Sequence, residues 1–144
     1  MLIRRILTAL GRKPPPTVSV IRLSGIIGAG GALRSGITLS ALAPVIERAF
    51  AVPDQQAVAL QINSPGGSPV QSALVAGRIR QLADEKKVPV FAFAEDVAAS
   101  GGYWLACAAD EIHADPSSII GSIGVVSAGF GFQDLIAHPS PHPL

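Results

Sequence analysis

The chain has 144 residues, a length that accommodates a single domain with its own hydrophobic core. Hydrophobic residues make up 49% of the chain and charged residues only 15%, whereas about 25% charged is usual for a soluble domain. The net charge of +1 gives no electrostatic case for binding nucleic acid or an acidic substrate. This apolar composition favours a parallel β-sheet that is covered on both faces.

Residues 1–16 form a basic, proline-rich N-terminal segment. Its apolar stretch from Ile6 to Leu10 is too short for a signal peptide or a membrane span. Two alternatives stay open for it, a frayed terminus and a short basic amphipathic helix that touches a membrane surface. The uncharged run 116–133 reaches the length of a span, but its glycines and serines favour strands and turns. We expect a cytoplasmic protein or one peripheral to the inner membrane.

Strand and helix patterns alternate after this segment. The predicted elements are a strand at Thr17–Leu23, a glycine-rich loop over 25–36, a helix at Leu39–Ala51 after the N-cap Thr38, a strand at Ala57–Ile62, a helix from Ser68 to about Lys87, a strand at Val88–Ala94, a helix from Ser100 or Gly101 to Ala109, and a strand at Glu111–Ala114. This order predicts an α/β fold with a mainly parallel sheet. Such sheets bind ligands at the carboxyl ends of their strands, where two glycine-rich turns fall, at 63–67 and 98–102.

The first turn, Asn63-Ser64-Pro65-Gly66-Gly67, leads from a predicted strand into a predicted helix. Ser68 is placed to cap that helix, Pro69 suits its first position, and Gln71 completes a capping box. Adjacent glycines can present backbone N–H groups to an oxyanion or a carbonyl. A tight, well-capped turn with no binding role explains them equally well. The turn is not a phosphate loop, because it lacks the glycine spacing and the lysine of that motif.

The second turn places Ser100 after a predicted strand and at the start of a predicted helix. A hydroxyl there lies at the positive end of the helix dipole, and the following N–H groups point the same way. That geometry suits a nucleophile whose tetrahedral intermediate carries an oxyanion. A role as helix cap would explain Ser100, but not Gly101 and Gly102, each of which costs about 1 kcal/mol inside a helix. Two adjacent glycines indicate that something approaches the backbone closely.

Three motifs in this order resemble the protease IV/signal peptide peptidase A family of serine peptidases. They are Ile62-Asn63-Ser64-Pro65-Gly66-Gly67-Ser68, Ala98-Ala99-Ser100-Gly101-Gly102-Tyr103 and Gly121-Ser122-Ile123-Gly124-Val125. The resemblance covers about residues 17–137, and leaves 138–144 as a proline-rich tail unlike the family. It implies the fold shared by Clp proteases and crotonases, assembly as a homo-oligomer, and cleavage of peptides such as leftover signal peptides.

The resemblance also implies roles for single residues. Ser100 matches the nucleophile, while the Gly101 N–H and an N–H from Gly66 or Gly67 match the oxyanion hole. The residues that match a strand lining the substrate cleft are Gly121, Ser122, Ile123, Gly124 and Val125. Small residues such as Ala98 and Ala99 fit a cleft for small apolar side chains.

The chain departs from the family in its lysines. A serine hydroxyl is a poor nucleophile unless a base takes its proton, and family members use a lysine well downstream of the serine. This chain has lysines only at 13, 86 and 87, and we expect the last two at an exposed helix end. The sequence therefore reads as a peptidase domain truncated before its lysine, with little or no activity alone.

A histidine base is the alternative, because a Ser-His-Asp set can be built in many chain orders. His113 has Asp110 and Asp115 nearby in sequence, but a surface histidine on a strand explains it more simply. The histidines lack metal-ligand spacing, and Cys107 is the sole cysteine, so we expect no metal and no cofactor. The apolar neighbours of Cys107 predict a buried structural thiol.

Two rival functions stay open. A crotonase-type protein would bind an acyl-CoA thioester carbonyl with two backbone N–H groups, and Glu95 and Glu111 are the glutamates near the predicted cleft. A non-catalytic fragment, or a partner that joins full-length homologues in a ring, is the second rival.

Overall fold

The computed structural model describes residue 11 and residues 15–28 and 36–125 of the chain. Its strands are β1 (Thr17–Ser24), β2 (Gln55–Ser64), β3 (Val90–Ala99), β4 (Glu111–Ala114) and β5 (Ile119–Gly121), and its helices are α2 (Leu39–Phe50), α3 (Pro69–Lys86) and α4 (Gly101–Ala106). The predicted order of strands and helices is confirmed. The N-terminal basic segment, apart from Gly11 and the last two prolines, and the tail at 138–144 lie outside the described residues.

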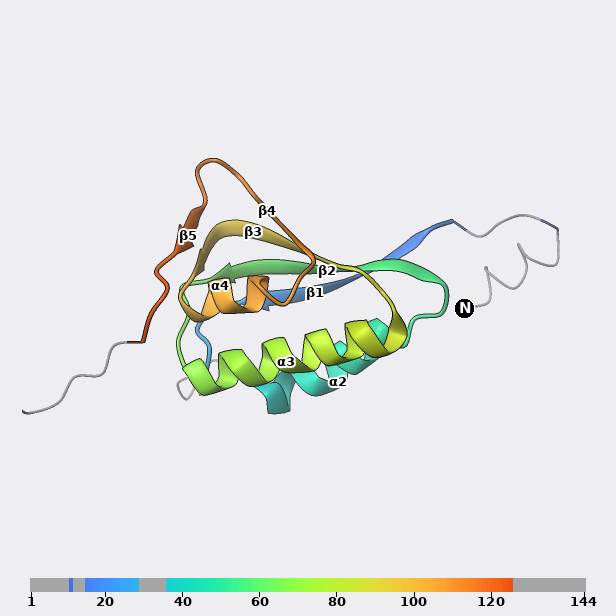
Figure 1. The fold of residues 1–144 in the computed structure, drawn as a ribbon, viewed down its shortest axis with the longest axis horizontal. Coiled ribbons are helices and arrows are strands. Elements are labelled where there is room, and N and C mark those ends of the chain that lie inside the picture. The colour runs from blue at the N-terminus through green and yellow to red at the C-terminus, as the bar shows by residue number, and fades with distance from the viewer. Residues whose placement is uncertain (1–10, 12–14, 29–35, 126–144) are drawn as a thin grey trace, which may run out of the picture.

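The strands form one parallel sheet in the order β1-β2-β3-β4, and β5 pairs with the far end of β3. Figure 1 shows the helices gathered on one side of this sheet, with α2 and α3 running side by side beneath it. Because every paired strand runs the same way, the carboxyl ends of β1, β2 and β3 meet at one edge. The predicted α/β fold with a mainly parallel sheet is confirmed.

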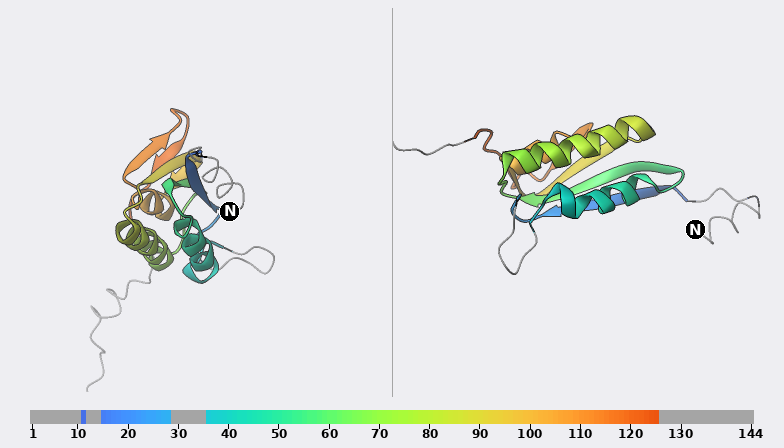
Figure 2. Two further views of the ribbon diagram at one scale, coloured as in Figure 1. Left: turned by 90° about the vertical axis from the view of Figure 1, so that its right-hand side faces the viewer. Right: turned by 90° about the horizontal axis from the view of Figure 1, so that it is seen from below.

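The core lies between the sheet and the helices, which form separate layers in the left view of Figure 2. Ile21, Leu60 and Val90 come from neighbouring strands and are fully buried there. The opposite face is open in the described part of the chain, where Val20 is 61% exposed and Phe93 is 45% exposed. The prediction of a sheet covered on both faces is therefore wrong for the described residues.

Strand β3 ends at Ala99, five residues beyond its predicted end, so Ser100 follows the strand directly. Polar side chains on β2 hold this extension: the Gln61 amide donates to Glu95 (2.6 Å) and the Asn63 amide donates to Asp96 (2.8 Å). The sequence pattern ended the strand at Ala94 because charged residues follow it. Cross-strand hydrogen bonds between polar partners make those residues compatible with a sheet.

The helix caps are partly as predicted. Thr38 accepts a hydrogen bond from the Ala41 N–H at the start of α2, and Ser68 accepts one from the Gln71 N–H at the start of α3. The second half of the predicted capping box is absent, because the side-chain oxygen Oε1 of Gln71 accepts from the Leu39 N–H instead (2.9 Å). This bond ties the first turn of α2 to the first turn of α3.

Helix α4 ends at Ala106, three residues before its predicted end. No helix in the described ranges combines the length and apolarity that crossing a bilayer requires.

Candidate active site

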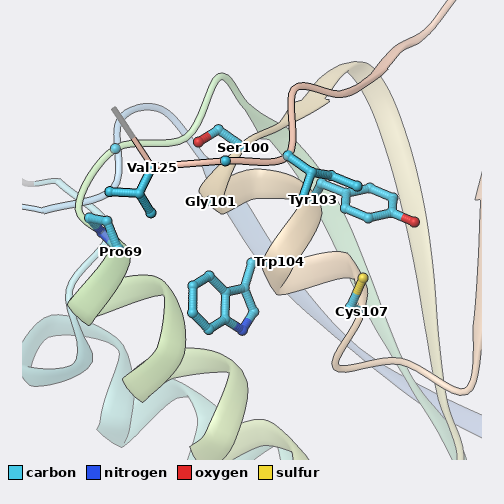
Figure 3. Close-up of a pocket in the computed structure, with 10 residues that line it drawn as sticks. Pro69, Ser100, Gly101, Tyr103, Trp104, Cys107 and Val125 are labelled. Carbon is cyan, nitrogen blue, oxygen red and sulfur yellow. The ribbon is translucent and has the colours of Figure 1, made fainter. Parts of the chain in front are cut away.

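Ser100 lies at the sharp corner between β3 and α4. Its backbone has φ 52° and ψ −119°, a left-handed conformation that non-glycine residues seldom adopt. Its N–H donates to the Gly121 carbonyl (2.7 Å), which ties the corner to β5. Its side chain makes no capping hydrogen bond and lines a cavity of about 430 Å³ (Figure 3). Helix capping therefore does not explain this serine.

Gly66 brings the first glycine turn against this corner. A Cβ atom at Gly66 would lie 2.8 Å from the Ser100 Cβ, and equally close to the Ala99 carbonyl oxygen and the Gly101 nitrogen. Real Cβ atoms essentially never approach other atoms this closely, so only glycine permits the contact. Two turns separated in sequence by a helix and a strand thus meet at Ser100.

The two glycines that begin α4, Gly101 and Gly102, also permit close contacts that a side chain would block. A Cβ at Gly101 would collide with the Ser72 hydroxyl, and one at Gly102 would collide with the Ser64 carbonyl oxygen. The close approach predicted from the adjacent glycines is the approach of α4 to the ends of β2 and α3.

Two backbone donors remain beside Ser100. The Gly66 N–H donates to the Ser64 hydroxyl (3.2 Å) and is satisfied. Within the described ranges, the N–H groups of Gly67 and Gly101 make no hydrogen bond, and both residues line the Ser100 cavity. An unsatisfied backbone N–H is costly unless water or a ligand pairs with it. The arrangement can therefore receive an oxygen atom that carries negative charge.

The cavity walls are apolar and come from three segments. Figure 3 shows Pro69 from the start of α3, Trp104 from α4 and Val125 around the same open space as Ser100. The sequence patterns did not identify Pro69, Tyr103 and Trp104 as wall residues. For the two aromatic residues a signal was available, since a serine that faces a cavity from a helix start brings the next turn of that helix to the wall.

The segment 121–125 takes part in two ways. Ile123, Gly124 and Val125 line the cavity, while Ser122 lines an adjoining cavity of about 520 Å³ that also reaches Ser100. Gly121 contributes its carbonyl to the Ser100 backbone. Strand β5 ends at Gly121, so the residues that line the cavities lie after the strand and not within it.

Two other expectations about the site are corrected by the structure. Ala98 and Ala99 are buried in the core, so they form no part of the cavity surface. Cys107 is exposed and lines the cavity, because α4 ends one residue before it and turns its side chain outward. The prediction of a buried structural thiol is therefore wrong.

A proton acceptor is missing from the described walls. None of the described residues that line the two cavities at Ser100 carries a carboxylate, an imidazole or an amine. Lys86 and Lys87 border a separate cavity beside Phe50 at the far end of α3, and a helix of 18 residues is about 27 Å long. Lys13 lies outside the described residues.

The histidine alternative is not assembled either. His113 stacks on Phe93, with ring centroids 5.0 Å apart, and its Nε2 lies 3.5 Å from a Glu111 carboxylate oxygen. Asp110 instead accepts from the Val90 N–H (2.7 Å) and forms an ion pair with Arg80 of α3. The Asp115 carboxylate accepts from the Ser117 N–H in its own turn.

The glutamates of the crotonase alternative lie elsewhere. Glu95 accepts from Gln61 on the open face of the sheet, and Glu111 pairs with His113. Neither lines a cavity at Ser100. In the part of the chain that the structure describes, no group of three or more His, Cys, Asp or Glu side chains is placed to hold a metal ion.

Comparison with known proteins adds independent findings. The family model described as peptidase family S49 matches residues 82–139. "Protease 4" of Haemophilus influenzae is 32% identical over 128 residues, which are 89% of this chain and 21% of that protein. A solved structure of a mutant of the 1510-N membrane-bound stomatin-specific protease has a TM-score of 0.58 at 20% identity, covering 81% of this chain and 54% of the other. That structural likeness bears on the fold alone.

A Brucella melitensis protein named Na(+)/H(+) antiporter NhaA is 54% identical over 136 residues. The match covers 94% of this chain but only 18% of that protein, so the transporter name is not carried over to the shared segment. The chain spans about a fifth of the length of the curated relatives it matches. The motifs, the fold and these matches agree: residues 82–139 match peptidase family S49, and protease 4, SppA and SohB are among the chain's relatives.

Proposed function

We propose that this chain carries the nucleophile and the oxyanion hole of a serine endopeptidase of the SppA/SohB type. Ser100 is the nucleophile, and the N–H groups of Gly67 and Gly101 form the oxyanion hole. The observation that carries the proposal is the strained Ser100 corner, whose hydroxyl shares a cavity with two backbone donors that lack partners among the described residues. Strained corners of this kind also present the serine of other hydrolases.

In the proposed reaction, the Ser100 oxygen attacks the carbonyl carbon of a peptide bond while a base takes the hydroxyl proton. The carbonyl oxygen becomes an oxyanion and accepts hydrogen bonds from the Gly67 and Gly101 N–H groups, each worth about 10²–10³ in rate. The C–N bond then breaks, the leaving amine takes a proton, and water hydrolyses the acyl-enzyme.

The walls of the cavity favour an apolar substrate. Trp104 and Val125 provide apolar surface beside Ser100, and no described wall residue is charged. A peptide with an apolar side chain next to the scissile bond fits this surface, as leftover signal peptides would. By the same family relationship, we propose that the active form is a homo-oligomer. We propose that it associates peripherally with a membrane and cleaves membrane-derived peptides.

The mechanism needs a proton acceptor, and none of the described residues that line the cavities at Ser100 carries a carboxylate, an imidazole or an amine. We propose that it comes from outside the described residues, and that the chain with the printed sequence cleaves peptides at or near the background rate. Lys86 and Lys87 are ruled out for it because they lie at the opposite end of α3 from Ser100.

A small primary amine in solution is expected to replace the missing acceptor. The cavity at Ser100 is only partly enclosed by the described residues, so ethylamine can reach the hydroxyl and take its proton. Hydrolysis of a fluorogenic peptide with an apolar side chain at the cleavage site is expected to rise at least about tenfold with ethylamine, in proportion to its neutral form. Release of the fluorophore is the measurement.

Two variants control this experiment. Ser100→Ala is expected to abolish the amine-dependent rate, whereas Ser40→Ala, which removes an exposed hydroxyl on α2, is expected to leave it unchanged. Efficient Ser100-dependent hydrolysis without any amine would refute the claim that the chain lacks its base. An amine effect that persists in Ser100→Ala would refute the assignment of Ser100.

A further inference from the structure

Ser64 is the last residue of β2 and is fully buried. A buried hydroxyl is costly unless its hydrogen-bonding capacity is used. The Ser64 hydroxyl donates to the Gly25 carbonyl oxygen (2.6 Å) and accepts from the Gly66 N–H (3.2 Å). A hydroxyl has a single proton, so once it is donated to Gly25, only a lone pair can face Gly66. The directions of both hydrogen bonds are therefore fixed.

Among the described residues, the other hydrogen bonds of this turn leave the Gly67 N–H without a partner. The Gly66 carbonyl accepts from the Ile27 N–H (2.9 Å), and the Ile27 carbonyl accepts from the Ser68 N–H (2.8 Å). Gly66 is thus satisfied at both its N–H and its C=O. In the described part of the chain, Gly67 is the residue of the glycine pair whose N–H has no partner, and Gly67 lines the Ser100 cavity.

Ser64 also touches the second turn. A Cβ atom at Gly102 would collide with the Ser64 carbonyl oxygen, so the start of α4 packs directly against the Ser64 backbone. One buried residue therefore contacts the Gly25 loop, the Gly66-Gly67 turn and the helix that follows Ser100.

We propose that Ser64 is a positioning residue of the oxyanion hole. Its hydroxyl takes the Gly66 N–H out of the cavity and leaves the Gly67 N–H as the donor that faces the substrate. This inference rests on the proposed function and deepens it, because it names the residue that makes Gly67, and not Gly66, the donor. Ser64 itself touches neither the substrate nor the reacting atoms.

Ser72 provides a matched control for Ser64. It is also a fully buried serine, and its hydroxyl donates to the Ser68 carbonyl one helical turn earlier (2.8 Å). It packs beside Gly101 but makes no hydrogen bond to the Gly66-Gly67 turn in the described ranges. Replacing either serine with alanine removes one buried hydroxyl, and both variants are expected to lose stability. Only Ser64→Ala is expected to alter the oxyanion hole.

The test is the binding of acetyl-dialanyl-boroleucine to the full chain. The Ser100 oxygen adds to the trigonal boron, the hydroxyl proton passes to buffer, and the resulting tetrahedral boron anion places an oxygen in the oxyanion hole. This equilibrium needs no general base. Boron NMR reports the tetrahedral species, and the fluorescence of Trp104, the sole tryptophan in the chain, reports the affinity. Ser64→Ala is expected to bind about tenfold more weakly, whereas Ser72→Ala is expected to bind as the wild-type chain does.

The outcomes separate the inference from the function on which it rests. If the wild-type chain forms the tetrahedral adduct and Ser64→Ala and Ser72→Ala bind it equally well, the assignment of Ser64 is wrong and the proposed function stands. If the wild-type chain forms no tetrahedral adduct, or Ser100→Ala forms it equally well, the proposed function fails and the assignment of Ser64 fails with it. Amide exchange gives a second readout, because Ser64→Ala should speed exchange at Gly66 and Ser72→Ala should not.

Discussion

Replacing Gly66 with alanine is expected to lower the free energy of unfolding by about 3 kcal/mol. The new methyl group would lie 2.8 Å from three atoms of the Ser100 corner, and overpacking of this kind costs about 1–3 kcal/mol. Gly66 also has φ 101°, a conformation in which a side chain adds about 1–2 kcal/mol of strain. The atoms in its way are mainly backbone, so relief requires the two glycine turns to move apart. Urea denaturation measures the change.

Gly77→Ala is the matched control. Gly77 lies within α3, and a Cβ added there would meet nothing within 4 Å. Alanine is the better helix former by about 0.5–1 kcal/mol, so this variant is expected to be more stable than the wild-type chain. A Gly66→Ala variant as stable as the wild-type chain would contradict the close contact between the turns.

Replacing Ser100 with glycine is expected to raise the free energy of unfolding by about 1 kcal/mol, because relief of about 1–3 kcal/mol of strain outweighs about 0.5–1 kcal/mol of added backbone freedom in the unfolded chain. The same change removes the proposed nucleophile. Ser100 has φ 52° and ψ −119°, and glycine adopts such a conformation without the steric cost of a Cβ. Its side chain faces a cavity and makes no capping hydrogen bond, so little packing is lost. Thermal unfolding of the two proteins in parallel measures the difference.

Ser100→Ala separates strain from chemistry. It removes the hydroxyl but keeps the Cβ, so its stability is expected to stay near that of the wild-type chain. A Ser100→Gly variant less stable than Ser100→Ala would show that the corner is not strained. The expected order, with glycine most stable, would identify a position where stability is exchanged for function.

The order of strands and helices could be predicted because their patterns are local. Apolar runs and turn residues marked each strand, and Thr38 and Ser68 marked the helix starts. The end of β3 could not be predicted this way. Glu95 and Asp96 look like loop residues until their partners on β2, Gln61 and Asn63, are known.

The meeting of the two glycine turns followed from the parallel sheet and the family resemblance. The separate tasks of Gly66 and Gly67 did not, because they depend on the partners that Ser64 and Ile27 supply from the fold. The apolar walls were missed for a related reason. Trp104 and Cys107 look like core residues of an apolar helix, and only the early end of α4 turns Cys107 outward.

The Ser100 hydroxyl is expected to react as a nucleophile in the cavity where the two glycine turns meet. Reaction with a fluorophosphonate in the presence of ethylamine tests this most directly, because the serine oxygen displaces fluoride and the amine takes the hydroxyl proton. Peptide mapping by mass spectrometry is expected to find the phosphonyl group on Ser100 and not on Ser122, which lines the adjoining cavity. A label spread over several serines, or an equal label on the Ser100→Ala variant, would contradict the assignment.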